Sequence, residues 1–165
     1  MGFSEDLERI TLQERELILP SLDAEFAWKL GTHLRTLAVE RKLAVVIDIR
    51  RFGQPLFYAA IDGTTPDNVE WVRRKSNVVA RFHRSSYAIG LKEKIKNETL
   101  LETQGLPIAD FATHGGSFPL TIAGAGIVGS VTVSGLPQRA DHELVIEALC
   151  SLLGRDYEQL RLLRE

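Results

Sequence analysis

Segments with apolar residues at helical spacing alternate along the chain with short, β-branched apolar runs. The helical spacing predicts helices at residues 4–18, 21–41, 66–84, 87–97 and from 137 onward. The β-branched runs predict two hairpins, with strands at residues 43–49 and 56–61, then at 117–123 and 127–134, and a further short strand that ends at Pro20. This order of elements predicts an α+β fold, with a central antiparallel sheet between layers of helices.

Turn and cap residues support several of these boundaries. Ser21 or Asp23 can cap the second helix, and Thr65 can cap the third, with Pro66 at its first position. The sequence contains no linker, low-complexity tract or repeat, so we expect one domain over residues 1–165.

Composition narrows the class of protein. The chain has 165 residues, of which 44% are hydrophobic and 25% charged, as in ordinary globular domains. Its 20 Lys and Arg residues against 22 Asp and Glu residues give a net charge of -2, which excludes a strongly basic protein that binds nucleic acid. No apolar run approaches the ~18 residues of a membrane span, and the charged first residues do not resemble a signal peptide. We therefore expect a cytoplasmic protein with no membrane partner.

Cysteine and histidine spacing argues against dedicated metal or redox sites. Cys150 is the only cysteine, so no disulfide can form within the chain, and its place in the last helix predicts an outward-facing thiol. No histidine pair has the spacing of a zinc motif.

Gly124, Gly126 and Gly129 spell the G-x-G-x-x-G fingerprint of dinucleotide-binding proteins. That motif functions where a strand ends and a helix begins, but here the glycines lead into the β-branched run at residues 130–133. We therefore interpret them as a hairpin turn.

Two charged residues occupy apolar helix faces. Lys75 lies in the same arc as Trp71 and Val79, and Asp141 lies in the same arc as Val145. A buried lysine needs a carboxylate partner or a ligand, so Lys75 and Asp141 are candidates for a buried ion pair beside a pocket. The alternatives are a lysine stem that reaches the surface and an acid favoured by the helix dipole.

Basic residues cluster on the helix that contains Lys75. The set comprises Arg73, Arg74, Lys75, Arg81 and Arg84. A solvated helix face and a surface that binds anionic groups are both compatible with this pattern.

The loop at residues 112–119 is the strongest candidate for a ligand site. Gly115 and Gly116 allow close approach of a ligand and offer backbone N–H groups, Ser117 follows them, and His114 can act as a metal ligand, a haem axial ligand or a general base. The alternative is a helix stop that leads into a hairpin.

The sequences of this loop and of the segment that follows it resemble the haem-degrading-domain family (HbpS/GlcG/PduO-C-like). The resemblance rests on the sequence His-Gly-Gly-Ser-Phe-Pro at 114–119, Gly-Ile-Val-Gly at 126–129, Val-Ser-Gly-Leu-Pro-Gln at 133–138 and Asp-His at 141–142. It extends over residues 24–153, and the variant with Ser-Gly-Leu-Pro-Gln and Asp-His resembles a cytosolic branch of the family.

The resemblance implies a profilin-like α-β-α sandwich that assembles into homodimers or larger homo-oligomers. Some members bind haem, and some are described as degrading it. Lys75, Gly115, Gly116 and Asp141 match positions around the family pocket. His114 is not general to the haem-binding members, so haem ligation does not follow automatically from the resemblance.

Three hypotheses for function follow. The first is an oligomeric domain that binds a small ligand, with haem as the leading candidate and His114 as its iron ligand. The second is an enzyme that acts on a small acidic metabolite, with Lys75 holding the anion and Asp141 or His114 acting as base. The third is a non-catalytic interaction protein whose function is its oligomeric assembly. Trp28 lies on the polar side of the helix predicted at residues 21–41 and is a candidate for the oligomer surface.

Overall fold

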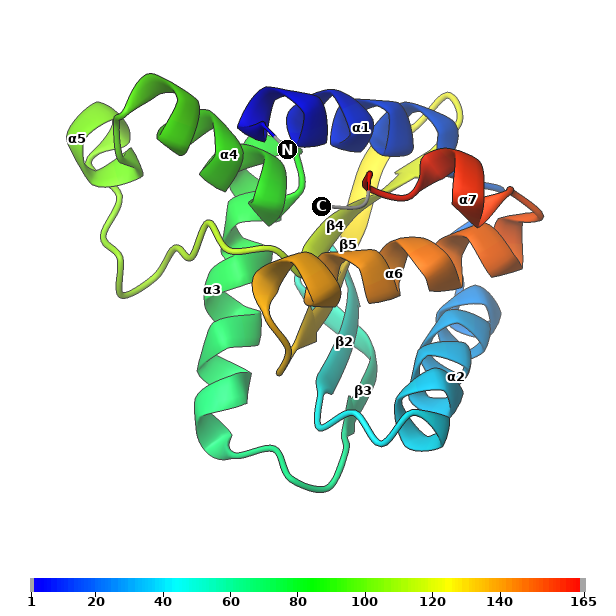
Figure 1. The fold of residues 1–165 in the computed structure, drawn as a ribbon. Helices are drawn as coiled ribbons and strands as arrows, with labels where there is room; N and C mark the ends of the chain where they lie inside the picture. Colours follow the sequence, from blue (N-terminus) through cyan, green and yellow to red (C-terminus); the bar gives the residue numbers. More distant parts are fainter. Residues whose placement is uncertain (1, 164–165) are drawn as a thin grey trace.

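The computed structural model describes residues 2–163 and consists of a five-stranded sheet with helices packed on both faces (Figure 1). The helices of the described part are α1 (Phe3–Glu16), α2 (Ala24–Glu40), α3 (Pro66–Phe82), α4 (Ser86–Lys96), α5 (Leu100–Gln104), α6 (Gln138–Leu153) and α7 (Tyr157–Leu160). Its strands are β1 (Ile18–Leu19), β2 (Val46–Arg51), β3 (Gln54–Ala60), β4 (Ser117–Ile122) and β5 (Gly126–Ser134).

The two predicted hairpins lie side by side in the sheet. The strand order is β1-β4-β5-β2-β3, so β5 of the second hairpin pairs with β2 of the first, and Ile47 lies opposite Val133. All of these pairs are antiparallel, as predicted, except that β1 joins β4 in parallel at the edge. The short β1 directly follows α1 and pairs with β4, which lies much later in the sequence. The local sequence pattern does not reveal this pairing.

The two faces of the sheet differ in polarity because neighbouring residues of a strand point to opposite sides. One face carries Ile47, Ile49, Val131 and Val133, which pack with α2 and α6 in the main hydrophobic core. The other face, under α3, carries mainly polar side chains that are nonetheless buried: Asp48, Ser117, Ser130, Thr132 and Ser134. A polar layer between a helix and a sheet is costly unless its groups are hydrogen-bonded or face a ligand.

A smaller apolar cluster forms where α1 lies against α4. It contains Ile10, Tyr87, Leu91 and Leu162, and in Figure 1 it lies at the end of the sheet that α1 and α4 cover. The guanidinium of Arg84 pairs with Glu14 across these helices, and the N–H of Ser85 donates to the same carboxylate.

The helix boundaries agree with the local signals in the sequence. Asp23 caps α2 by accepting a hydrogen bond from Phe26 N at 2.8 Å. Thr65 precedes α3 as expected, and its N–H donates to Asn68 Oδ1 at 2.9 Å.

Three details differ from the sequence predictions. The short helices α5 and α7 are missed because each is too short for a periodic apolar pattern. The first turn is tighter than predicted, since β2 extends through Arg50 and Arg51 and β3 begins at Gln54. Cys150 is buried at 1% exposure, so the prediction of an outward thiol is wrong: α6 is covered on a second side by α2 and α7.

No helix within residues 2–163 combines the length and the apolar character needed to cross a membrane. Among the same residues, no three His, Cys, Asp or Glu side chains cluster in a way that could hold a metal ion.

Candidate functional site

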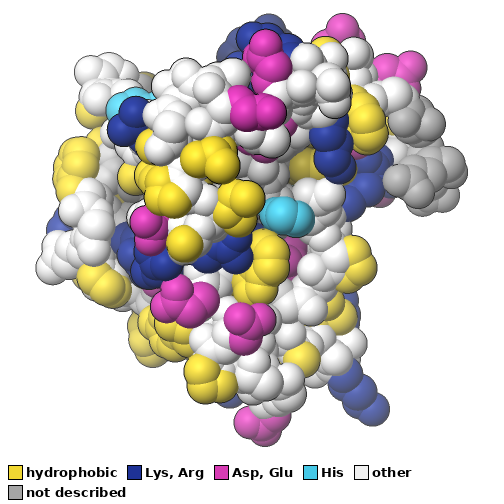
Figure 2. Space-filling model, turned by 90° about the vertical axis from the view of Figure 1, so that its left-hand side faces the viewer, with side chains coloured by type: hydrophobic (Ala, Val, Ile, Leu, Met, Phe, Trp, Pro, Cys, Tyr) yellow, Lys and Arg dark blue, Asp and Glu magenta, His cyan; other side chains and the backbone are white. Residues whose placement is uncertain are grey.

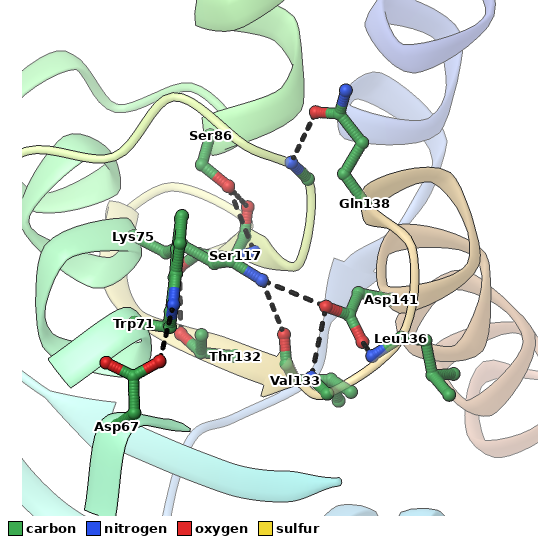
Figure 3. Close-up of polar contacts among 12 residues, drawn as sticks. Asp67, Trp71, Lys75, Ser86, Ser117, Thr132, Val133, Leu136, Gln138 and Asp141 are labelled. Atoms are coloured by element: carbon green, nitrogen blue, oxygen red, sulfur yellow. Dashed lines mark hydrogen bonds and ion pairs between the residues drawn. The ribbon is translucent and has the colours of Figure 1, made fainter. Parts of the chain in front are cut away.

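Lys75 of α3 and Asp141 of α6 meet beside the carboxyl end of β5 (Figure 3). Lys75 Nζ lies 3.0 Å from Asp141 Oδ2 and donates a second hydrogen bond to the carbonyl of Val133 at 3.2 Å. Both side chains are almost fully buried, at 4% and 2% exposure. The candidate ion pair between these two buried charges is therefore present.

Backbone groups fix the carboxylate of Asp141. The N–H of Leu136 donates to Oδ1 at 2.9 Å, and the N–H of Gly135 donates to Oδ2 at 3.3 Å. These donors belong to the Ser-Gly-Leu-Pro-Gln segment that leads from β5 into α6, so this segment aims the carboxylate at Lys75.

Burial acts on the protonation of both partners. It lowers the pKa of Lys75, against the attraction of the Asp141 carboxylate. It raises the pKa of Asp141, although Lys75 and the two backbone donors oppose this shift. Desolvation disfavours both charges, so the proton on Lys75 is held less firmly than on an exposed lysine.

The glycines of the loop permit close approach of the backbone to this pair. Gly116 has φ of 136°, and a Cβ there would collide with the carbonyl of Val133 and lie 2.7 Å from Lys75 Nζ. A side chain at Gly115 would likewise collide with the backbone of Gln138. Both glycines are thus required by the packing of the loop against α3 and α6, and the packing alone explains them.

His114 stands at the mouth of the site. Its ring meets the ring of Trp71 edge-on, with centroids 5.1 Å apart. Partial burial, followed by the charges of Lys75 and Arg74, lowers the pKa of His114, so the imidazole is neutral near pH 7. Neither ring nitrogen has a hydrogen bond partner among residues 2–163, so both are available to a ligand.

Two cavities adjoin His114. One, of about 230 Å³, is lined by Trp71, Lys75, Ser134, Leu136 and Asp141 among others. The other, of about 450 Å³, lies between α4, α5 and the loop, and both are lined by His114 and Gln138. Ligand pockets typically measure ~300–1,000 Å³. The smaller cavity reaches this range only together with its neighbour across His114.

The structure brings most of the predicted site residues together. Lys75, His114 and Asp141 line the smaller cavity, and Gly115 and Gly116 pass directly behind it. Ser117 does not line it: its side chain is buried, with Oγ 2.9 Å from Thr132 Oγ1, and its N–H donates to Ser86 Oγ.

The basic residues of α3 are mostly used in holding the chain together. Arg73 contacts Asp110 at 3.0 Å, and Arg74 donates to the carbonyl of Ile108 and stacks on Trp71. These contacts fasten the segment at residues 105–112 along the outside of α3. Figure 2 views this side of the molecule and shows Lys and Arg side chains beside hydrophobic ones. Neither a bare solvated face nor a free anion surface describes this helix.

Two further residues belong to the site. Gln138 accepts a hydrogen bond from Gly115 N at 3.2 Å and lines both cavities. Trp71, whose helical spacing predicts only an apolar contact, lines the smaller cavity and donates a hydrogen bond to Asp67 Oδ2. The Pro-Gln dipeptide at the start of α6 was the available signal for Gln138.

The first two glycines of the G-x-G-x-x-G pattern form a hairpin turn, as interpreted, and Gly129 lies within β5. Gly124 and Gly126 connect β4 to β5 with φ of 79° and 82°, and no helix follows them. A dinucleotide therefore has no helix N-terminus to bind at this motif.

Comparison with known proteins places these features in a family. The profile of the family described as "Haem degrading protein HbpS-like" matches residues 22–150, which include every residue of the site. The chain belongs to this HbpS-like family. It is 60% identical to a UPF0303 protein of Burkholderia thailandensis over 164 residues, which cover 99% of each chain. It is 58% identical to a UPF0303 protein of Paraburkholderia phymatum, over 98% of each.

Solved structures of the HbpS-like fold are similar to this chain. The crystal structure of the Ybr137w protein has a TM-score of 0.83 at 28% identity and covers 90% of this chain and 87% of its own. The complex of PduOC with haem has a TM-score of 0.68 at 15% identity, covering 79% of this chain and 94% of its own. At that identity, the likeness to PduOC shows the fold alone. The expected profilin-like α-β-α sandwich agrees with the observed architecture.

Proposed function

We propose that the protein binds a small ligand with a carboxylate group at the cavity of Lys75, Asp141 and His114, and that haem is the leading candidate. The observation that carries the proposal is the buried ammonium of Lys75. It has three donors, of which Asp141 and the Val133 carbonyl accept two. No other residue of the described chain accepts the third, and Lys75 lines the cavity, so a ligand carboxylate can accept it.

The residues at the cavity suit haem in chemical type. His114 offers a neutral imidazole at the surface, as an iron ligand requires. Lys75 is a cation for one propionate, and Trp71, which lines the same cavity, provides an apolar wall beside it. Bound haem would supply iron for oxygen chemistry. Because the smaller cavity holds only about 230 Å³, haem would have to extend across His114 into the neighbouring cavity.

Titration of the ligand-free protein with haemin tests this proposal through the Soret band. We expect a sharp, saturable band for the wild type and a weaker, shifted band for His114→Ala. The matched control is His33→Ala, which changes a histidine on α2, on the opposite side of the sheet. Added imidazole should restore the band of His114→Ala. Unsaturable binding, or equal bands in all three proteins, would contradict the proposal.

A second candidate function is proton transfer on a small acidic metabolite. It is favoured by the lowered pKa of Lys75 and the raised pKa of Asp141, since groups with shifted pKa values in a cavity are typical of catalytic sites. Lys75 would hold the anion, and Asp141 or His114 would accept the proton. Native mass spectrometry of the purified protein distinguishes the candidates: a bound small acid favours this one, and a mass of haem favours the first.

We also propose that the protein associates with itself. Strand β3 is an edge of the sheet and pairs only with β2 among the described strands, so its outer backbone groups are free to pair. Trp28 lies beside this edge at 61% exposure, with its ring 5.9 Å from that of Phe57. Light scattering should give a mass of a dimer or more for the wild type and for Phe3→Gln, an exposed site on α1, and a monomer for Trp28→Glu. A monomeric wild type would contradict the proposal.

A further inference from the structure

A separate cavity of about 410 Å³ lies at the opposite end of α3. It is bounded by the second half of α3, the turn between β2 and β3, and the first residues of β5. It shares no lining residue with the cavity of Lys75. Its volume lies within the usual range of ligand pockets without the contribution of a neighbouring cavity. Gly129, the last glycine of the G-x-G-x-x-G pattern, forms part of its wall.

Arg50 lines this cavity, and the buried carboxylate of Asp48 holds its guanidinium in place. Asp48, two residues earlier on the same side of β2, accepts hydrogen bonds from Arg50 Nε at 2.6 Å and from Nη2 at 3.2 Å. Asp48 is 1% exposed, whereas the side chain of Arg50 is 28% exposed. The carboxylate thus fixes the plane of a guanidinium that reaches toward the surface.

The outer edge of this guanidinium is free. Asp48 takes the edge formed by Nε and Nη2, and no residue within 2–163 accepts a hydrogen bond from Nη1. The Nη1–Nη2 edge presents two parallel N–H donors, which match the two oxygens of a carboxylate. Arg50 is therefore oriented to form a second bidentate contact.

The charge at this site favours a singly charged ligand. Asp48 and Arg50 compensate each other, so a bound carboxylate adds one negative charge beside a neutral pair. Among the residues that line the cavity, His83 is the only other group able to carry a positive charge. A ligand with a dianionic group such as phosphate would leave more charge uncompensated in a partly enclosed site.

The remaining walls favour an apolar body. Val79, Ala80, Ile127 and Val128 line the cavity beside Arg50. Phe52 stands at its rim at 81% exposure, held in the left-handed region at φ of 49° by the tight turn. A bulky residue rarely adopts this conformation, and an exposed aromatic ring beside a cavity is suited to stacking on a flat ligand.

From this geometry we infer that the cavity beside Arg50 is a second binding site, for a small aromatic monocarboxylate. The carboxylate accepts two hydrogen bonds from the outer edge of Arg50, and the ring lies between the apolar walls and Phe52. Nothing in this inference depends on the ligand of the Lys75 cavity.

NMR titration of the ¹⁵N-labelled protein with 2-naphthoate tests the inference, with neutral 2-naphthamide as the matched probe. We expect saturable shifts at the amides of Gly53 and Gly129, and at least tenfold weaker binding of the amide. Arg50→Lys keeps a cation for Asp48 but cannot form both bidentate contacts, so it should weaken naphthoate binding tenfold or more. Arg51→Lys, at the adjacent residue outside the cavity, should bind as the wild type does.

A second variant keeps the test decisive if Arg50→Lys disturbs the fold. Ala80 is an exposed helical residue that lines the cavity, so Ala80→Leu should fold normally and abolish the shifts by filling the space. Equal affinity for 2-naphthoate and 2-naphthamide, or no saturable shift at Gly53 and Gly129, would overturn the inference. Shifts confined to Gly115 and Gly116 would also overturn it, while supporting the proposed function of the first cavity.

Discussion

At the scale of single residues, two oppositely charged side chains are buried, although burial disfavours the charged form of each. Lys75 and Asp141 form an ion pair that is cut off from solvent on all sides but the cavity. Such a pair is a weak source of stability compared with apolar packing, but removal of one partner leaves an uncompensated charge. Its position beside a cavity is better explained by ligand binding than by stability.

We predict that Lys75→Met lowers the free energy of unfolding by about 3–5 kcal/mol, because it leaves the Asp141 carboxylate buried without a cation. The double variant Lys75→Met/Asp141→Asn should recover part of the loss, since an amide oxygen can still accept from Leu136 N. Urea denaturation measures both. A loss below about 1 kcal/mol, as for an exposed pair, would show that the pair is open to solvent.

Acid should destabilise the protein through His142. This ring is fully buried, its Nε2 lies 2.7 Å from Gln13 Oε1, and burial lowers the pKa of His142 to about 3. The unfolded chain takes up a proton below about pH 6.5 while the folded chain does not, so stability is full above that pH and falls as the pH drops toward 3. Between pH 7 and 5 this amounts to about 2 kcal/mol.

The measurement is urea denaturation at pH 7 and 5. His142→Gln retains a donor for Gln13 but does not titrate, so its stability should fall by about 2 kcal/mol less than that of the wild type over this interval. If both proteins lost the same amount, His142 would be accessible to protons in the folded state.

At the scale of elements, α3 organises both cavities and the segment that crosses it. Its first half, up to Lys75 near the middle of the helix, lines the first cavity, and its second half lines the Arg50 cavity. Its outer side holds residues 105–112 through Arg73, Arg74 and Asn77, and Asn77 Nδ2 donates to the carbonyl of Asp110 at 2.9 Å.

We predict that Arg74→Ala loosens this segment without unfolding the protein. Hydrogen exchange measured by mass spectrometry should quicken over residues 106–112, because the bond to the Ile108 carbonyl and the stack on Trp71 are lost. Arg81→Ala, an exposed arginine of the same helix with no such contact, is the control and should exchange as the wild type does. Unchanged exchange in Arg74→Ala would mean that the segment is held by its other contacts.

The sequence predicts elements with strong periodic patterns and misses what depends on contacts between distant segments. The hairpins, α2, α3 and α6 follow from apolar spacing and cap residues. The places of Lys75 and Asp141 on apolar helix faces predict two buried charges, but their pairing is inferred from the expected topology and not from spacing. The parallel contact of β1 with β4 and the burial of Cys150 depend on tertiary packing, which local spacing does not encode. The contacts of Arg74 with Ile108 and Trp71 likewise depend on tertiary packing.

At the scale of the whole molecule, the sheet has an apolar face and a polar face. The face under α2 and α6 supplies the hydrophobic core, while the face under α3 carries buried polar groups with a cavity at each end. The main hydrophobic core and the two cavities thus lie on opposite sides of one sheet.

We expect the ligand to bind in the first cavity rather than on another surface of the protein. The most direct measurement is NMR titration of the ¹⁵N-labelled protein with gallium protoporphyrin, a diamagnetic analogue of haemin. We expect saturable shifts centred on the amides of Gly115, Gly116 and Gln138, and their loss in His114→Ala. Shifts centred elsewhere on the protein, or a wild type that gives no saturable shift, would contradict haem binding at this site.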